Sequence, residues 1–279
     1  MLYIIIFVLF IIIAAAAWLL WEPYCIAVRE KELKYDSLPE EFNGFSVLFM
    51  SDIHTSKWGF MEKKLCGKLE TVPKCDICIL GGDLAYRAEV TENIPKILSH
   101  AKIGGDVFCV PGNTEYKPHN DPEELFGIYS GFGYNVLRNS NVALRRNGKK
   151  IIVAGADDPI NFMEDIPKTF SGTEKEDFKI LVSHCPSVAP DVFDFGVNLV
   201  LAGHTHGGQV KLPFFTVYTH MNRNKYLNKG IWDGEKLGRK LGKKLRDFYL
   251  VISNGIGCSQ LWIRFNARPE IYRITLKKK

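Results

Sequence analysis

The sequence predicts an α/β domain preceded by a helix that spans a membrane. Three observations lead to this prediction. An unbroken apolar run opens the chain, short aliphatic runs then alternate with longer polar stretches, and metal-ligating side chains follow five of those runs. With 46% hydrophobic and 24% charged residues, the chain is able to bury a large core, which excludes a disordered protein or a coiled coil.

The first 24 residues are predicted to be a membrane anchor. Leu2 to Trp21 is apolar throughout, and as a helix it would be about 30 Å long, the thickness of the hydrocarbon part of a bilayer. Trp18, Trp21 and Tyr24 cluster at its far end, as interfacial aromatic residues do, and Pro23 is expected to stop the helix there.

A cleaved signal peptide is the alternative to an anchor, because Ala14 to Ala17 offer a small-residue cleavage site. However, no Lys or Arg precedes the apolar run, which favours the anchor. Basic residues follow the run at Arg29, Lys31 and Lys34, so the positive-inside bias predicts a single-pass protein of the cell membrane with its large domain in the cytoplasm. Seven cysteines without a repeated spacing agree with a reducing compartment.

Residues 25–43 are predicted to be a charged connector, and residues 44–279 one large folded domain. Within the domain, β-branched runs of three to six residues are typical of buried strands. They are Phe45–Met50, Ile77–Leu80, Val107–Val110, Ile151–Ala154, Ile180–Val182 and Val197–Ala202, with later strands at Gln209–Leu212, Phe248–Ser253 and Ile271–Leu276. Glu62–Val72 and Glu92–Lys102 are long enough for crossover helices, which indicates βαβ units.

Polar side chains follow five of the predicted strands. They are Asp52 and His54, Asp83, Asn113, His184, and His204 and His206. The carboxyl ends of strands in an open α/β sheet form one rim, so these loops are expected to converge there. Oxygen and imidazole ligands suit manganese, iron, zinc or magnesium. Glycines flank several of these residues and allow the backbone to approach a charged centre.

In this order, the motifs resemble those of the calcineurin-like metallophosphoesterases, which run DxH, GD, GNH(E/D), H and GHxH. The segments GHTHGGQVKLP and RFNARPEI resemble the membrane-associated bacterial branch. The resemblance implies a two-sheet β-sandwich flanked by helices. It also implies two divalent metal ions, and manganese is expected ahead of iron, zinc or magnesium. Asp52, His54 and His206 would hold one ion, Asn113, His184 and His204 the second, and Asp83 would bridge them. Asp83, Asn113 and His204 are the expected catalytic residues.

The third motif departs from the family pattern, because the chain has Thr114 where the family usually has His. Thr114 cannot act as a general acid, and losing one typically costs about 10² to 10⁴-fold when the leaving group is poor. A phosphate leaving group needs less proton transfer. The departure therefore favours a pyrophosphate or another substrate with a good leaving group, as in the UDP-diacylglucosamine pyrophosphatases, which the chain resembles here.

Further residues are expected near the substrate. Thr114, Asp158 and His220 are candidates for binding it, and a role for Asp158 in forming the turn before Pro159 is the alternative. The insertion 223–246 holds nine basic and two acidic residues. Its amphipathic part is expected to be a helix beside the active-site mouth, where Arg239 and Lys240 would bind the substrate or anionic headgroups; a solvated surface helix is the alternative.

The sequence as a whole predicts a membrane-anchored phosphohydrolase with two metal ions. It would cleave a phosphodiester or pyrophosphate bond, and a lipid-linked or nucleotide-linked substrate is the most specific form of this expectation. A broad phosphodiesterase or phosphatase and a metal-binding regulator without turnover are the alternatives. The expected partners are a phosphorylated small molecule or lipid and the membrane; nucleic acid is not expected, and a monomer is.

Overall fold

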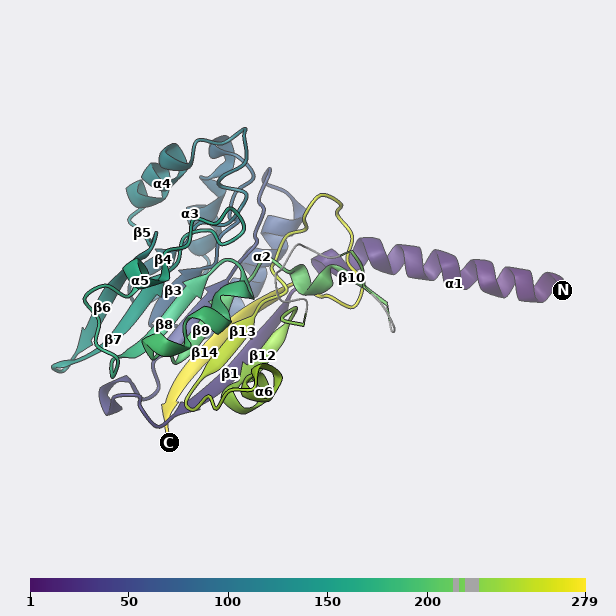
Figure 1. Ribbon diagram of the computed structural model, residues 1–279. Helices are drawn as coiled ribbons and strands as arrows, with labels where there is room; N and C mark the ends of the chain where they lie inside the picture. Colours follow the sequence, from purple (N-terminus) through teal and green to yellow (C-terminus); the bar gives the residue numbers. More distant parts are fainter. Residues whose placement is uncertain (213–215, 219–225) are drawn as a thin grey trace.

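Two six-stranded sheets lie face to face, with helices on the outer face of each, in the computed structural model (Figure 1). The structure describes residues 1–212, 216–218 and 226–279. This is the helix-flanked sandwich that the family resemblance implies.

The first sheet has the order β1-β14-β2-β3-β4-β5. Its strands are β1 (Ala27–Tyr35), β2 (Ser46–Met50), β3 (Ile77–Leu80), β4 (Val107–Cys109), β5 (Asn135–Val136) and β14 (Glu270–Lys278). Strands β2 to β5 are parallel, and β14 runs antiparallel to β2. Because the parallel strands share a direction, the loops after β2, β3 and β4 leave the sheet at one rim.

The second sheet has the order β12-β13-β9-β8-β7-β6. Its strands are β6 (Ser140–Arg146), β7 (Lys149–Gly155), β8 (Phe178–Ser183), β9 (Leu199–Ala202), β12 (Gly230–Asp233) and β13 (Tyr249–Ile252). Strands β7, β8, β9 and β13 are parallel. A separate antiparallel pair joins β10 (Val210–Lys211) and β11 (Thr216–Tyr218).

Aliphatic and aromatic side chains fill the space between the sheets. Val47, Phe49 and Ile79 of the first sheet belong to the same buried cluster as Ile180 and Leu201 of the second. Alternate residues of each strand therefore face the partner sheet, and the others face the helices. This explains why the strands read as nearly continuous apolar runs in the sequence.

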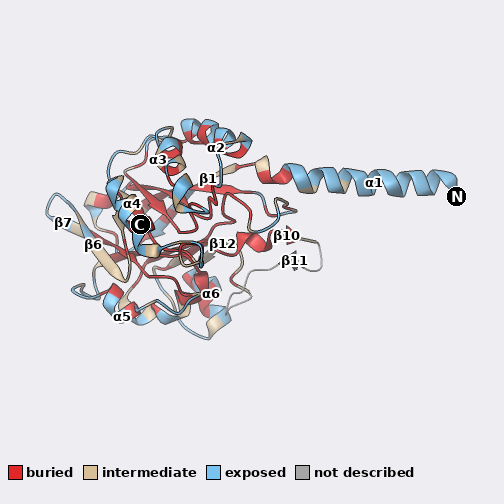
Figure 2. Cartoon of the chain, turned by 90° about the horizontal axis from the view of Figure 1, so that it is seen from above, coloured by how far each residue is buried: buried red, intermediate tan, exposed pale blue. Residues whose placement is uncertain are grey.

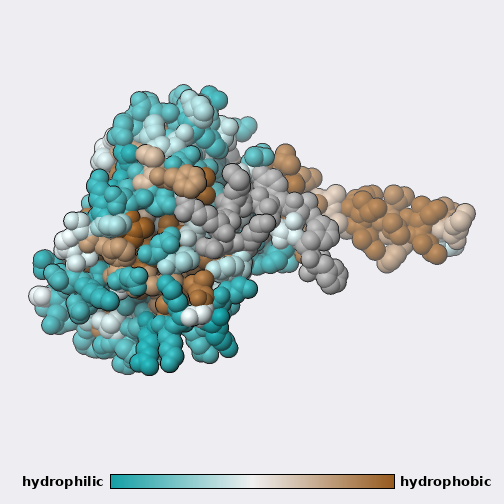
Figure 3. Space-filling view, in the orientation of Figure 1, coloured by the Kyte–Doolittle hydropathy of each residue, from teal (hydrophilic) through white to brown (hydrophobic). Residues whose placement is uncertain are grey.

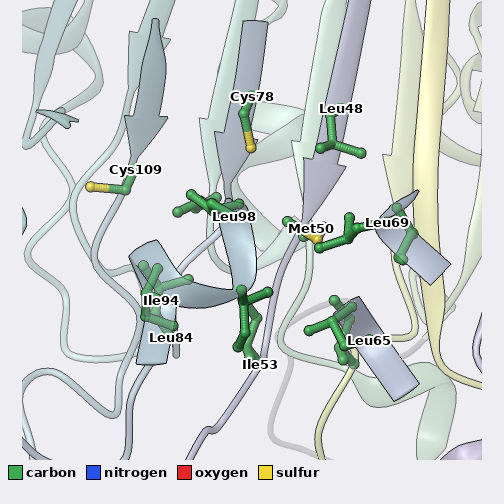
Figure 4. Close-up of a cluster of buried hydrophobic side chains, with 14 of the residues drawn as sticks. Leu48, Met50, Ile53, Leu65, Leu69, Cys78, Leu84, Ile94, Leu98 and Cys109 are labelled. Atoms are coloured by element: carbon green, nitrogen blue, oxygen red, sulfur yellow. The ribbon is translucent and has the colours of Figure 1, made fainter. Parts of the chain in front are cut away.

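Helices α2 (Phe60–Thr71), α3 (Asn93–Leu98) and α4 (Pro122–Gly131) cover the outer face of the first sheet. Figure 4 shows Leu65 and Leu69 of α2 close to Met50 of β2. Helices α5 (Ile166–Thr169) and α6 (Gly234–Leu241) cover the second sheet. Short 3₁₀ helices are η1 (Glu22–Tyr24), η2 (Glu40–Phe42), η3 (Ala88–Val90), η4 (Pro186–Asp191), η5 (Phe193–Phe195) and η6 (His206–Gly208). Figure 2 shows that the interior of the domain is mostly buried, whereas α1 is mostly exposed.

Helix α1 (Leu2–Trp21) has the predicted bounds and projects away from the domain. None of its most apolar window is buried, and it is long and apolar enough to cross a membrane. Figure 3 shows it as a hydrophobic rod beside a mostly hydrophilic domain.

The predicted connector 25–43 contains β1, so here the structure differs from the expectation. Strand β1 pairs with β14 along its whole length, from Ala27 opposite Glu270 to Tyr35 opposite Lys278. Its four consecutive charged residues, Arg29 to Glu32, are all exposed, as an edge strand permits. The pairing makes the segment part of the domain and fixes where α1 leaves it.

Candidate metal centre

The expected ligands from five separate loops meet at the rim where the parallel strands of both sheets end. Asp52, His54 and His206 form one group whose ligand atoms all lie within 4.8 Å of one another, and Asp52, Asp83 and His184 form a second. Asp52 belongs to both groups. All five of these side chains are buried.

The distances between nitrogen and oxygen atoms show how closely these groups approach. Nε2 of His206 lies 3.4 Å from Oδ1 of Asp52 and 3.3 Å from Nε2 of His54. Nε2 of His184 lies 3.5 Å from Oδ1 of Asp83.

The remaining two expected ligands adjoin His184. Oδ1 of Asn113 lies 3.2 Å from Nε2 of His184, and Nδ1 of His204 lies 3.3 Å from the same nitrogen. The structure thus brings all seven sequence-predicted ligands into one cluster.

The backbone at the cluster adopts a conformation that most residues avoid. Asp52, His54, Asp83, His204 and His206 have φ values from 46° to 66°, in the left-handed region. Such strain persists where the surrounding structure enforces it, and it gathers at functional sites.

Gly112 and Gly203 are required by close approach. A Cβ on Gly112 would lie 2.3 Å from Oδ1 of Asp83. A Cβ on Gly203 would lie 2.2 Å from Oδ2 of Asp52. The two glycines therefore leave room for the carboxylates that face the cluster.

A layer of hydrogen bonds orients the carboxylates of the cluster. The Ser51 hydroxyl donates to Oδ2 of Asp52 at 2.5 Å, and the backbone N–H of His204 donates to both Asp52 oxygens at 3.0 and 3.1 Å. The N–H of Thr114 donates to Oδ1 of Asp83 at 2.7 Å. Partners of this kind commonly tune metal affinity.

Two buried charged residues that the sequence analysis did not single out support the cluster. Glu115 accepts the N–H groups of Gly112, Asp83 and Leu84 at 2.9 to 3.1 Å. Arg264 is fully buried; its Nη1 donates to the Ala267 carbonyl at 2.6 Å, and its Nη2 contacts the Gly257 carbonyl and lies 3.2 Å from Nδ1 of His206. Glu115 ends the third motif, which reads GNTE in this chain, and Arg264 opens the segment RFNARPEI; these motifs were the available signal.

Electrostatics of the cluster depend on burial and mutual charge. Burial lowers the pKa of His54 to about 4, so this imidazole is neutral near pH 7 and able to bind a cation. Burial would also lower the pKa of His184, but the carboxylates of Asp83, Asp52 and Asp158 raise it to about 9. Burial opposes ionisation of Asp83, but the imidazoles of His184 and His54 hold the pKa of that carboxyl below its usual range.

These residues fit divalent cations. Carboxylate, amide and imidazole groups approach one another closely in a buried place, and positive charge between them would relieve the repulsion of the carboxylates. A pair of bound cations would supply Lewis acidity, which lowers the pKa of an attacking water and neutralises charge on a phosphoryl group. The chain itself supplies fixed ligand positions and a rim that shields most of them from solvent.

Thr114 is buried and faces away from solvent. It is 0% exposed, and its hydroxyl has no hydrogen-bond partner among the described residues. Its contact with the cluster is the backbone N–H that binds Asp83. The side chain expected to contact substrate is therefore enclosed.

Asp158 is used in a turn. It is 0% exposed, and its carboxylate accepts the N–H of Ile160 at 2.9 Å and the side-chain amide of Asn161 at 2.6 Å. This is the turn-forming alternative of the sequence analysis. His220 lies outside the described residues.

The structure places Arg239 and Lys240 away from the cluster, in contrast to the expectation. Strand β12 starts at Gly230, opposite Ile252 at the rim of the cluster, and ends at Asp233, opposite Tyr249 at the other rim. Helix α6 begins directly after Asp233 and ends at Leu241, because Gly242 adopts a left-handed conformation. The direction of β12 therefore carries the basic helix to the far end of the sheet, away from the base of α1 (Figure 1).

The end of α1 meets the cluster side of the domain. The N–H of Arg264 donates to the Leu19 carbonyl at 3.0 Å. Glu22 is 1% exposed and accepts the N–H groups of Asn266 and Ala267 at 2.9 and 2.7 Å. The loop that carries Arg264 is thus fixed both to α1 and to His206.

Comparison with known proteins places the chain in a family. Residues 45–208 match the family model described as calcineurin-like phosphoesterase, and the chain belongs to that family. The matched range contains all seven residues of the cluster.

Several relatives align over most of the chain. An uncharacterized metallophosphoesterase of Bacillus subtilis, YkuE, is 28% identical over 92% of this chain and 87% of its own length. The uncharacterized protein YpbG of the same organism is 29% identical over 83% of this chain and 80% of its own length. A Bos taurus transmembrane protein with a metallophosphoesterase domain is 26% identical over 90% of this chain and 57% of its own length.

The family and the site define a metal-dependent phosphoester hydrolase with a dinuclear centre. The apolar α1 and the transmembrane relative weakly indicate association with a membrane.

Proposed function

We propose that this protein is a membrane-anchored phosphohydrolase that cleaves a pyrophosphate bond, or an ester with a good leaving group, in a substrate held at the membrane. The observation that carries the proposal is a complete ligand cluster combined with an enclosed Thr114 in place of a general acid. Such a site activates water but gives little proton help to a departing alkoxide.

The first proposed ligand set is one of the two groups of the cluster, and the second set is built around His184 of the other group. Asp52, His54 and His206 would hold one cation. Asn113, His184 and His204 would hold the other, with Asp83 between them. The distances of 3.2 to 3.5 Å among these atoms support this division, and Asp83, Asn113 and His204 would face the reacting phosphate. Manganese is the metal we would test first.

The position of α1 supports action at a membrane. Strand β1 starts beside the end of β14 that lies at the cluster, and Arg264 links the end of α1 to His206. A substrate that is confined to the bilayer would therefore reach the cluster without leaving the surface. We propose that this surface is the cytoplasmic one, because Arg29, Lys31 and Lys34 follow the span and the cysteines of the described chain are free.

A series of phosphodiesters with leaving groups of graded pKa tests the proposal. The full-length protein is assayed with manganese on aryl and alkyl diesters and on a nucleotide-linked pyrophosphate, and kcat/KM is plotted against leaving-group pKa. We expect a steep fall, with alkyl diesters about 10² to 10⁴-fold poorer than a general acid would permit.

Thr114→His gives the internal comparison. The added imidazole should flatten the slope and improve alkyl diesters more than the pyrophosphate. If both improve equally, or if wild type shows no dependence on the leaving group, the missing acid does not determine substrate choice, and a broad phosphodiesterase is the better description. Asp83→Asn, expected to abolish turnover, shows that the measured hydrolysis belongs to this site.

A further inference from the structure

A cavity of about 570 Å³ lies where α1 joins the domain, and we propose that it binds the phosphate headgroup of an anionic membrane lipid. Its size is in the range of small-molecule sites. The main polar residues around it are Trp18, Glu22, Arg29, Lys229, Arg268 and Glu270. The proposal rests on the membrane anchoring proposed above.

The residues that line the cavity carry a net positive charge. They include three basic residues, Arg29, Lys229 and Arg268, against two carboxylates. Glu22 is 1% exposed and already accepts the Trp18 indole N–H at 2.6 Å in addition to two backbone N–H groups. The Glu22 carboxylate is therefore already engaged by hydrogen bonds within the wall of the cavity.

The second carboxylate is also engaged. Glu270 is 6% exposed; it accepts Nε of Arg29 at 2.9 Å and the Tyr272 hydroxyl at 3.2 Å. Lys229 and Arg268 make hydrogen bonds only to backbone carbonyls, those of Asn266 and Cys25, among the described residues. These two cations have no carboxylate partner there, which is the arrangement that suits a phosphate.

Burial lowers the pKa of Lys229 and the charge of Lys211 lowers it further, whereas the carboxylates of Glu270 and Glu22 oppose the shift without cancelling it. A cation in such surroundings gains from an added anion. This supports a ligand with negative charge, because the two carboxylates only partly offset the three cations of the cavity.

The cavity lies at the depth of lipid headgroups if α1 spans the bilayer. Trp18 is in the last turn of α1 and lines the cavity. Beside it, the rings of Trp21, Tyr24 and Phe60 lie 5.1 to 6.5 Å apart. Phe60 is 51% exposed and Leu261 is 58% exposed. Exposed aromatic and aliphatic side chains at the end of an apolar helix are typical of a membrane interface.

The cavity and the metal centre share a loop. Asn254 lines the cavity, and the next residue, Gly255, lies so close to Asp52 that a Cβ would be 2.7 Å from Cβ of that residue. The N–H of Gly257 donates to the Asp52 carbonyl at 2.7 Å. A lipid headgroup in the cavity would therefore be separated from the cluster by the loop that contains Asn254 and Gly255.

Lipid binding to the full-length protein in a neutral detergent tests the proposal. Phosphatidylglycerol and phosphatidylcholine are titrated separately, and retained lipid is counted by native mass spectrometry alongside the thermal midpoint. We expect phosphatidylglycerol to be retained and to raise the midpoint, and phosphatidylcholine to do neither. Equal binding of both lipids, or an equal shift from inorganic phosphate at the same concentration, would overturn the proposal.

Charge-matched variants locate the binding. Lys229→Gln with Arg268→Gln should weaken phosphatidylglycerol binding about 30-fold, since each basic residue near a membrane contributes roughly 1 kcal/mol. Arg239→Gln with Lys240→Gln makes the same charge change on α6 and should leave binding unchanged. An equal loss in both variants would refute a specific site.

Two further readouts keep the test decisive. If the first double variant does not fold, Arg268→Gln alone, at an exposed position, should weaken binding about fivefold, and an unchanged affinity counts against the cavity. Binding is measured without turnover. A protein that binds phosphatidylglycerol but hydrolyses nothing would therefore contradict the proposed function and leave the lipid site standing.

Discussion

Gly112→Ala should inactivate the enzyme through a single added methyl group. A Cβ at position 112 would lie 2.3 Å from Oδ1 of Asp83 and 2.6 Å from its backbone nitrogen. Real Cβ contacts with such atoms are longer than 3.0 Å, so Asp83 must move by more than half an ångström. Because Asp83 is buried and its Oδ1 is held by the Thr114 N–H, the movement would carry the carboxylate away from both ligand groups.

The expected size of the effect follows from this displacement. A misplacement of about 1 Å is able to cost 10²-fold in rate, and overpacking a buried site typically costs about 1 to 3 kcal/mol of stability. We therefore expect kcat/KM for bis-p-nitrophenyl phosphate to fall by about 10² or more. The bound manganese, measured by elemental analysis after gel filtration, should fall below that of wild type.

Gly127→Ala is the matched control. Gly127 lies within α4, and a Cβ there would meet nothing within 4 Å. The same substitution should leave activity unchanged and stabilise the protein by about 0.5 to 1 kcal/mol. The reasoning is refuted if Gly112→Ala retains activity and metal content within about threefold of wild type while remaining folded by circular dichroism.

Two further predictions concern the support and the protonation of the cluster. Arg264→Met should weaken manganese binding by about 10 to 100-fold, measured by calorimetric titration, whereas Arg239→Met, on an exposed side chain of α6, should not; equal affinities would remove the role of Arg264 beside His206. Manganese binding should tighten as the pH rises from 6 toward 9, because His184 has its pKa raised to about 9 by Asp83 and Asp52 against the effect of burial, and a proton must leave before the cation binds. The protonated imidazole stabilises the metal-free protein below pH 6.5, and this stabilisation is lost as the pH rises through 9; proton uptake on metal binding at pH 7.5, in place of release, would contradict this.

The sequence was sufficient to predict the elements whose signal is local. The apolar run of α1, the strands β2, β3, β4, β7, β8 and β9, and the ligand-bearing residues after them are recognisable without a partner, whereas β5 and β6 were not predicted. Parallel strands with short loops also imply that their carboxyl ends share a rim. Convergence of Asp52, Asp83 and His184 was therefore predictable before any distance was known.

Tertiary structure decided the features that depend on partners far along the chain. The charged β1 became a strand because β14 pairs with it, and α6 came to the far rim because β12 runs away from the cluster. Burial of Thr114, Glu115 and Arg264 follows from packing of loops that are distant in sequence. Local residue patterns fix the type of an element where its own residues are apolar and periodic, which is not the case for β1. The rim and the neighbours of every element depend on strand order and direction, which only the folded chain sets.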